Sequence, residues 1–154
     1  MSWSAVRRRH SGRPVAVVLH GVGSTGEFAR RCLAAPLGSL GYDVVAPDLR
    51  GHASAGSCRD PAAHSVGSHL VDLQALAEQV DVRLVAGISL GAELALRWSA
   101  EHPRLDGVVL CLPGLTGPTT VAAAANRHVA DRVAREGVEP VLAELARDPA
   151  ALPW

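Results

Sequence analysis

Lysine is absent from this sequence, and all 15 basic residues are arginine. A Walker A loop, a Schiff base and a Ser–Lys pair each need a lysine amine, so these chemistries are excluded. Cysteine is scarce as well. The three cysteines, Cys32, Cys58 and Cys111, form no C-x-x-C pair and no metal-ligand set. We therefore expect reduced thiols in a cytoplasmic protein that holds no metal and no cofactor.

Net charge is lacking too, because 15 basic and 15 acidic residues balance to zero. A neutral chain has no bulk attraction for nucleic acid or for an acidic membrane. The longest apolar runs have the length of strands, and no apolar segment follows the arginines at 7–9, so neither a membrane helix nor a signal peptide is expected. The expected partner is a small-molecule substrate.

What the sequence does contain is an alternation of short apolar runs and helical segments. The continuous run Val15–Leu19 predicts a buried parallel strand. Further strands are predicted at 43–46, 83–86 and 108–112, and helices at 27–35, 68–80 and 92–101. We expect Pro36 to end or kink the first helix, Ser68 to cap the second, and residues 50–67 to form a loop. The alternation predicts an α/β fold with a parallel sheet of about four strands.

The pattern changes after Pro118. The segment that follows is rich in alanine and arginine and predicts two helices, at about 120–136 and 139–147, with no further strand. We therefore divide the chain into residues 1–118, an α/β core, and residues 119–154, a helical segment.

A serine pentapeptide follows the third predicted strand. Gly87-Ile-Ser89-Leu-Gly91 fits the pattern G-x-S-x-G, with a β-branched strand before it and a proline-terminated helix after it. In this pattern the serine occupies a strained strand-to-helix turn, and the glycines let the two backbones pass closely. The turn exposes the serine Oγ at the carboxyl end of the sheet and directs the amino terminus of the helix toward a developing oxyanion.

The glycine loop after the first strand allows a different interpretation. Gly21-Val-Gly-Ser-Thr-Gly26 fits G-x-G-x-x-G, and Asp48 follows the next strand where a ribose-binding acid is expected. The alternative is thus a dinucleotide (NAD)-binding module. Against it, Pro36 and Gly38 shorten the intervening helix, and this interpretation leaves the serine turn unexplained.

Three blocks occur in a familiar order. His20-Gly21, the segment Gly41–His52 (Gly-Tyr-Asp-Val-Val-Ala-Pro-Asp-Leu-Arg-Gly-His) and the serine pentapeptide together resemble the α/β-hydrolase fold superfamily over about residues 14–118. The resemblance implies part of a three-layer sandwich and a serine hydrolase acting on an ester, thioester or amide of a small molecule. It implies that Ser89 is the nucleophile and that the backbone N–H groups of Val22 and Leu90 form the oxyanion hole. His20 and Asp48 would be structural, and the 119–154 helices would begin a lid.

The same resemblance implies an acid and a histidine after later strands, which lie beyond Trp154. Three interpretations follow: a truncated chain with weak or absent activity, half of an assembly, or a non-catalytic relative that forms a homodimer. His52 is the best surrogate base within the chain, because its loop leaves the carboxyl end of a strand. The other histidines are expected in the tail (His10), facing solvent (His64, His69), far from the site (His102) or in the lid-like segment (His128).

Overall fold

The computed structural model of this chain describes residues 12–113 and 121–147. The chain forms two compact units, Met1–Gly114 and Leu115–Trp154. The expected boundary after residue 118 lies outside the described residues, as does His10.

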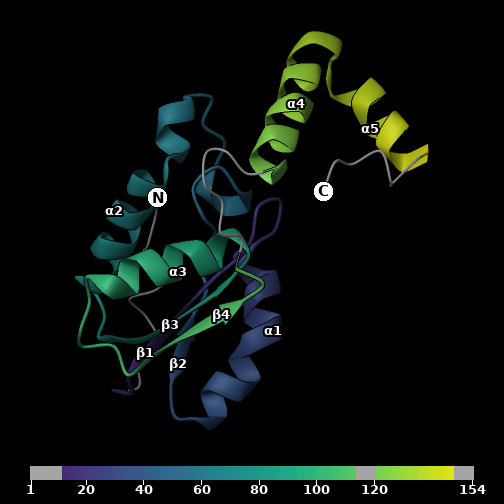
Figure 1. The fold of residues 1–154 in the computed structure, drawn as a ribbon. Coiled ribbons are helices and arrows are strands. Elements are labelled where there is room, and N and C mark those ends of the chain that lie inside the picture. Colours follow the sequence, from purple (N-terminus) through teal and green to yellow (C-terminus); the bar gives the residue numbers. More distant parts are fainter. Residues whose placement is uncertain (1–11, 114–120, 148–154) are drawn as a thin grey trace. The chain divides into compact units, whose positions relative to one another are not determined.

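The first unit is built on a four-stranded parallel sheet. Its strands are β1 (Val15–Leu19), β2 (Asp43–Val45), β3 (Val82–Ile88) and β4 (Gly107–Cys111). They lie in the order β2-β1-β3-β4, and every neighbouring pair is parallel (Figure 1). The predicted parallel sheet of about four strands is therefore confirmed.

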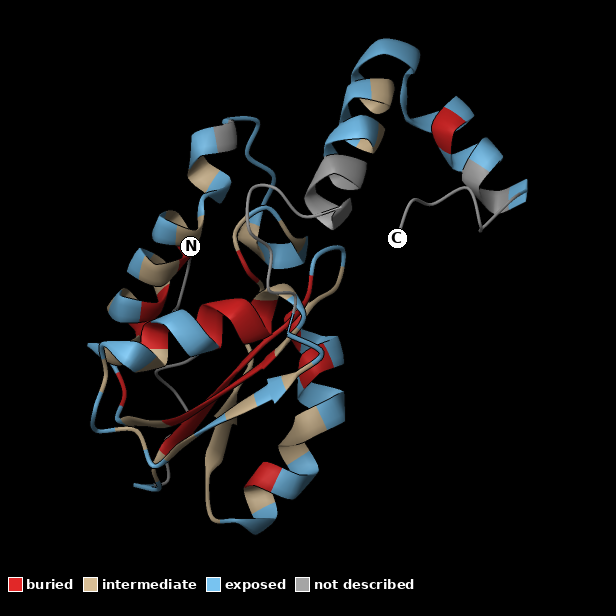
Figure 2. Cartoon of the chain, in the orientation of Figure 1, coloured by how far each residue is buried: buried red, intermediate tan, exposed pale blue. Residues whose placement is uncertain are grey.

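Helices cover both faces of this sheet, which makes three layers (Figure 1). One face packs against α1 (Gly26–Ser39), and the other packs against α2 (Val66–Ala77) and α3 (Leu90–Ala100). All five residues of β1 are buried, since alternate side chains enter the core on either face. This two-sided burial explains the continuous apolar run in the sequence. Burial declines from the centre of the sheet toward β4 (Figure 2).

Several local expectations were wrong. Pro36 was expected to end or kink the first helix, but it does not end it: α1 continues to Ser39, with Pro36 in its last turn. The N-cap of α2 is Ser65, whose Oγ accepts the Ser68 N–H at 3.2 Å, so this helix begins before the predicted residue. The expected loop 50–67 contains two short 3₁₀ helices, η2 (Ala53–Ala55) and η3 (Pro61–His64).

The second unit contains the helices α4 (Val121–Glu136) and α5 (Val138–Arg147). Gly137 joins them with a φ of +85°. Arg132 of α4 pairs with Glu136 on its own helix and with Glu144 on α5, and Val141 is buried. Among the described helices, none has the length and apolar character needed to cross a membrane.

Candidate active site

Ser89 lies where β3 ends and α3 begins. Its φ of +53° and ψ of −114° fall in a region that residues other than glycine rarely occupy, so the backbone is strained here. The Ser89 side chain does not cap the helix that it precedes. The backbone N–H of Ser89 donates instead to the carbonyl of Cys111 at 2.9 Å, which ties the turn to the end of β4. The predicted strand-to-helix turn is therefore present, and the Ser89 hydroxyl makes no capping hydrogen bond to the helix.

Glycines make this turn sterically feasible. A Cβ at Gly87 would collide with the backbone of Gly91, and a Cβ at Gly91 would collide with the backbone of Leu19. A Cβ at Gly21 would lie 3.2 Å from the Cβ of Ser89. The loop after β1 therefore passes directly against the serine.

Leu90 follows Ser89 directly, and Val22 follows Gly21, whose Cβ position would lie 3.2 Å from the Cβ of Ser89. Leu90 is the first residue of α3, so its N–H has no intrahelical acceptor and lies at the positive end of the helix dipole. Val22 follows Gly21 in a four-residue turn that the Ser24 N–H closes by donating to the Gly21 carbonyl at 3.2 Å. Gly23, the third residue of this turn, has a φ of +69°. These are the two residues that the sequence assigned to the oxyanion.

The segment Asp48–His52 holds the loop after β1 through three hydrogen bonds. The Leu49 N–H donates to His20 Nε2 at 2.9 Å. The Gly26 N–H donates to Asp48 Oδ1 at 2.8 Å, and the Gly23 N–H donates to His52 Nε2 at 3.2 Å. Two loops that are 22 to 29 residues apart in sequence are thus joined along their length. The resemblance implied that His20 and Asp48 are structural, and these hydrogen bonds agree with that expectation, but the partners themselves were not predicted.

Both ring nitrogens of His52 are engaged. Because Nε2 accepts from Gly23, Nδ1 carries the proton and donates to the Arg50 carbonyl at 3.1 Å. No hydrogen bond of the described residues joins His52 to Ser89, whose hydroxyl has no partner within residues 12–113 and 121–147. His52 and Ser89 occur at the same end of the sheet, but His52 contacts the loop and not the hydroxyl.

Two other histidines are buried. His20 is fully buried, and its Nδ1 donates to the Gly21 carbonyl at 2.7 Å. Burial lowers the pKa of His20, although this hydrogen bond opposes the shift. His69 was expected to face solvent, and that was wrong: it is 4% exposed. His69 lies one turn before Leu73 on the buried face of α2, and burial lowers its pKa as well.

Asp48 has a structural role, because both of its carboxylate oxygens accept hydrogen bonds from neighbouring loops. Its Oδ1 accepts from Gly26 and its Oδ2 from the Ser54 N–H and hydroxyl. Partial burial acts to raise its pKa, but the hydrogen bonds from Ser54 and Gly26 outweigh it, so the pKa lies below the ordinary value. Both oxygens therefore serve the protein's own loops, which disfavours a ribose-binding role.

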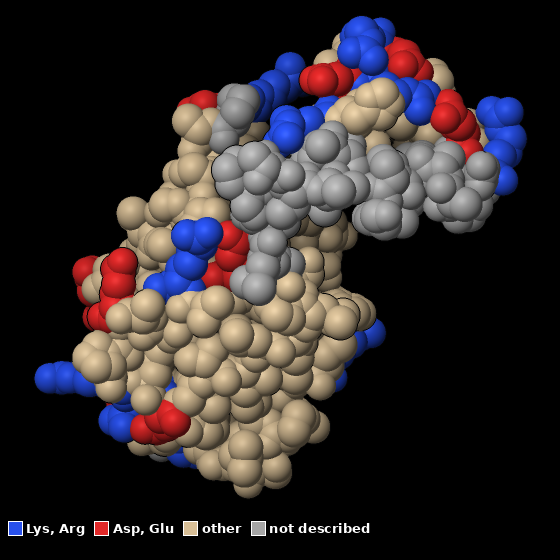
Figure 3. Space-filling view, viewed as in Figure 1, with Lys and Arg blue, Asp and Glu red and all other residues tan. Residues whose placement is uncertain are grey.

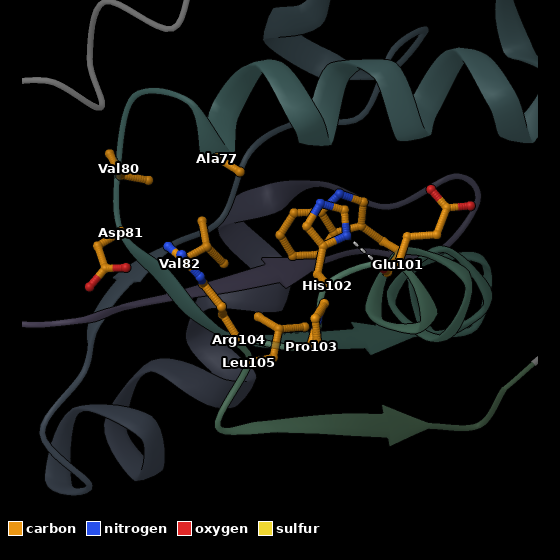
Figure 4. Close-up of a pocket in the computed structure, with 10 residues that line it drawn as sticks. Ala77, Val80, Asp81, Val82, Glu101, His102, Pro103, Arg104 and Leu105 are labelled. Carbon is orange, nitrogen blue, oxygen red and sulfur yellow. Dashed lines mark hydrogen bonds between the residues drawn. The ribbon is translucent and has the colours of Figure 1, made fainter.

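A cavity of about 310 Å³ lies at the opposite, amino end of the sheet (Figure 4). Trp98 and Leu105 line it, and His102 stacks on Trp98 with ring centroids 3.9 Å apart. This cavity is at the far end of α3 from Ser89, which confirms that His102 is remote from the serine. No group of three or more potential metal ligands gathers within the described part of the chain.

Comparisons with known proteins agree with this architecture. The family model described as "Serine aminopeptidase, S33" matches residues 10–147. The magnesium-chelatase 30 kDa subunit of Rhodobacter capsulatus is 30% identical over 123 residues, which are 76% of this chain and 42% of that protein.

Two solved structures are similar at 26% identity. A thioesterase domain from the curacin biosynthetic pathway superposes with a TM-score of 0.63, over 80% of this chain and 46% of that one. A proline iminopeptidase-related protein from Thermus thermophilus superposes with a TM-score of 0.62, over 84% and 51%. The chain therefore spans about half the length of the relatives that it matches.

Proposed function

Because this chain belongs to the serine aminopeptidase S33 family of α/β-hydrolases, we propose that it is a serine hydrolase with Ser89 as its nucleophile. The substrate class is an ester, thioester or amide of a small molecule. The observation that carries the proposal is the strained backbone of Ser89, since such strain persists where the surrounding structure imposes it and is concentrated at functional sites.

The chemistry follows from the groups around Ser89. Its Oγ would attack the substrate carbonyl carbon and lose its proton to a base, and the carbonyl oxygen would become an oxyanion. The N–H groups of Val22 and Leu90 would donate to this oxyanion, with the α3 dipole adding to the stabilisation. Loss of the alcohol, thiol or amine would leave an acyl-serine, which water would hydrolyse. The relatives whose names include a thioesterase and a peptidase-related protein are consistent with acyl transfer.

The base and its acid are the open part of this proposal. The two histidines that adjoin the glycine loop, His20 and His52, already accept backbone N–H groups, and the matched relatives are about twice as long as this chain. We propose that a further polypeptide segment supplies both groups. Without them, oxyanion stabilisation and binding alone would leave a rate on the order of 10³–10⁴-fold over water. Activity of the chain alone is expected to be weak or absent.

Fluorophosphonate labelling, followed by intact mass, tests the nucleophile. The reagent forms an Oγ–P bond as fluoride leaves, so each labelled serine adds one fixed mass. We expect slow labelling of the wild-type chain, none in Ser89→Ala, and an unchanged rate in Ser99→Ala, a serine on the same helix whose hydroxyl donates to the Leu96 carbonyl. Equal labelling of the wild type and Ser89→Ala would overturn the proposal. Fast labelling would retain Ser89 but show that this chain holds its own base.

A second candidate is a non-catalytic domain that binds a second copy of itself. Strand β4 lies at the outer edge of the sheet, and Val108 and Leu110 are 38% and 37% exposed. The visible surface over β4 carries no charged side chains (Figure 3). An unpaired strand with apolar neighbours is a template for pairing with another chain. Light scattering at increasing protein concentration measures the molar mass and tests this candidate. A dimer that Val108→Lys dissociates would support self-association, and a monomer at every concentration would rule it out.

A further inference from the structure

In the turn Gly21–Ser24, the central peptide group could adopt either of two orientations as far as the turn residues themselves are concerned. Gly23 has a φ of +69°, which places the central Val22–Gly23 peptide in the orientation of a type II turn. Glycine populates positive and negative φ about equally well, so a type I turn, with this peptide flipped, is open to the same residues. A Cβ at Gly23 would meet nothing within 4 Å, so no neighbouring atom crowds this residue.

The contact that distinguishes the two orientations comes from His52. The N–H of the central peptide is that of Gly23, and it donates to His52 Nε2 at 3.2 Å. A flipped peptide would present the Val22 carbonyl to the same nitrogen, and two acceptors would then face each other. His52 is itself held, because Nδ1 donates to the Arg50 carbonyl and its ring packs edge-on against buried His20 with centroids 4.9 Å apart.

We infer that His52 is a positioning residue, which holds the loop of Val22 in one conformation by accepting the Gly23 N–H with its neutral imidazole. The structural part of this inference stands on the hydrogen bond itself, and only its effect on catalysis rests on the proposed function. The loop it fixes contains one of the two N–H groups assigned to the oxyanion, and that loop lies against Ser89. His52 was also considered as a surrogate base. The two roles differ, because a base takes up and releases a proton during the reaction, whereas a positioning acceptor stays neutral.

This contact needs the neutral imidazole. An imidazolium has two N–H donors and no lone pair, so it would face the Gly23 N–H with a second donor.

Two substitutions of His52 distinguish a positioning role from a role in proton transfer. In His52→Gln the side-chain oxygen takes the place of Nε2 as an acceptor but cannot act as a base, whereas His52→Ala has no acceptor. His128→Gln, which changes an exposed histidine on α4, is the matched control. The hydrogen exchange of the Gly23 amide is measured in ¹⁵N–¹H spectra of the full chain at pH 7.5.

We expect the Gly23 amide to exchange about fivefold faster in His52→Ala at pH 7.5, since a hydrogen bond of this kind contributes about 1 kcal/mol. In His52→Gln the exchange should stay within about twofold of the wild type. Equal protection of the Gly23 amide in the wild type and in His52→Ala would overturn the inference.

The fluorophosphonate rate then tests the catalytic consequence separately. A positioning role predicts that His52→Gln labels Ser89 at close to the wild-type rate at pH 7.5 and that His52→Ala labels more slowly. Loss of labelling in both variants would assign proton transfer to His52 and overturn the inference. If Ser89 labels in no variant, the chain alone holds no activated nucleophile, while the Gly23 amide still decides the role of His52.

Discussion

The two ends of the parallel sheet are held by different kinds of contact. At the carboxyl end, side chains bond to backbone N–H groups of neighbouring loops, as Asp48 does to Gly26 and His20 to Leu49. At the amino end the contacts are exposed: Arg13 donates to the carbonyls of Gly38 and Gly41, and Arg83 and Tyr42 donate to Asp106. Exposed polar contacts contribute little, because water competes for the same groups. The buried and partly buried contacts that specify loop conformation are thus concentrated where Ser89 lies.

The largest difference in stability between the two ends of the sheet is expected when a glycine at each end is replaced by alanine. In Gly91→Ala the new Cβ would collide with the backbone of Leu19, which cannot move without disturbing β1. We expect a loss of at least about 3 kcal/mol in the free energy of unfolding, or failure to fold. Gly107→Ala at the amino end of β4 is the matched control, because a Cβ there meets nothing within 4 Å and should cost less than about 0.5 kcal/mol. Urea unfolding measures both, and equal losses would contradict the comparison.

A smaller effect is expected when a carboxylate is removed from the carboxyl end. Asp48→Ala leaves the N–H groups of Gly26 and Ser54 without their acceptor. Because these bonds go to a charged oxygen, we expect a loss of about 2 kcal/mol. Asp48→Asn should recover part of it, since one oxygen remains. A variant as stable as the wild type in urea would show that the Asp48–His52 segment does not stabilise the loop after β1.

Acidification should act on the carboxyl end as well. Burial lowers the pKa of His69 in the folded chain, so the unfolded chain binds a proton more readily. Stability is then fully present above the pKa of an unfolded histidine, about 6.5, and falls as the pH is lowered through it. We expect the urea midpoint to drop between pH 7.5 and pH 5.5, and less so in His69→Leu than in the wild type. The exposed-residue control, His128→Leu, should retain the full drop.

The parts of the fold that sequence could predict are those with local signals. β-branched runs, glycines and prolines define the four strands and the Ser89 turn within a few neighbouring residues. The burial of His69 was missed because a polar histidine at the start of a predicted helix was expected to face solvent, although it lies four residues before Leu73 on the buried face of α2. The contact between His52 and Gly23 joins residues 29 positions apart in two loops. No periodicity marks such a pair, because its geometry is set by the packing of the strands that precede both loops.

The smallest effect is expected at the amino end, in Asp106→Ala. Arg83 and Tyr42 lose their shared acceptor, but the side chains of Arg83 and Asp106 are each 39% exposed, so water replaces the lost hydrogen bonds. The hydrogen bond from Arg83 lowers the pKa of Asp106, so any contribution is present above the pKa of an unfolded aspartate and is lost as the pH falls through the folded value. At pH 7 we expect a urea midpoint close to that of the wild type, and a difference that disappears in high salt. A loss as large as that of Asp48→Ala would mean that the amino end is constrained as tightly as the carboxyl end, and the contrast between the two would fail.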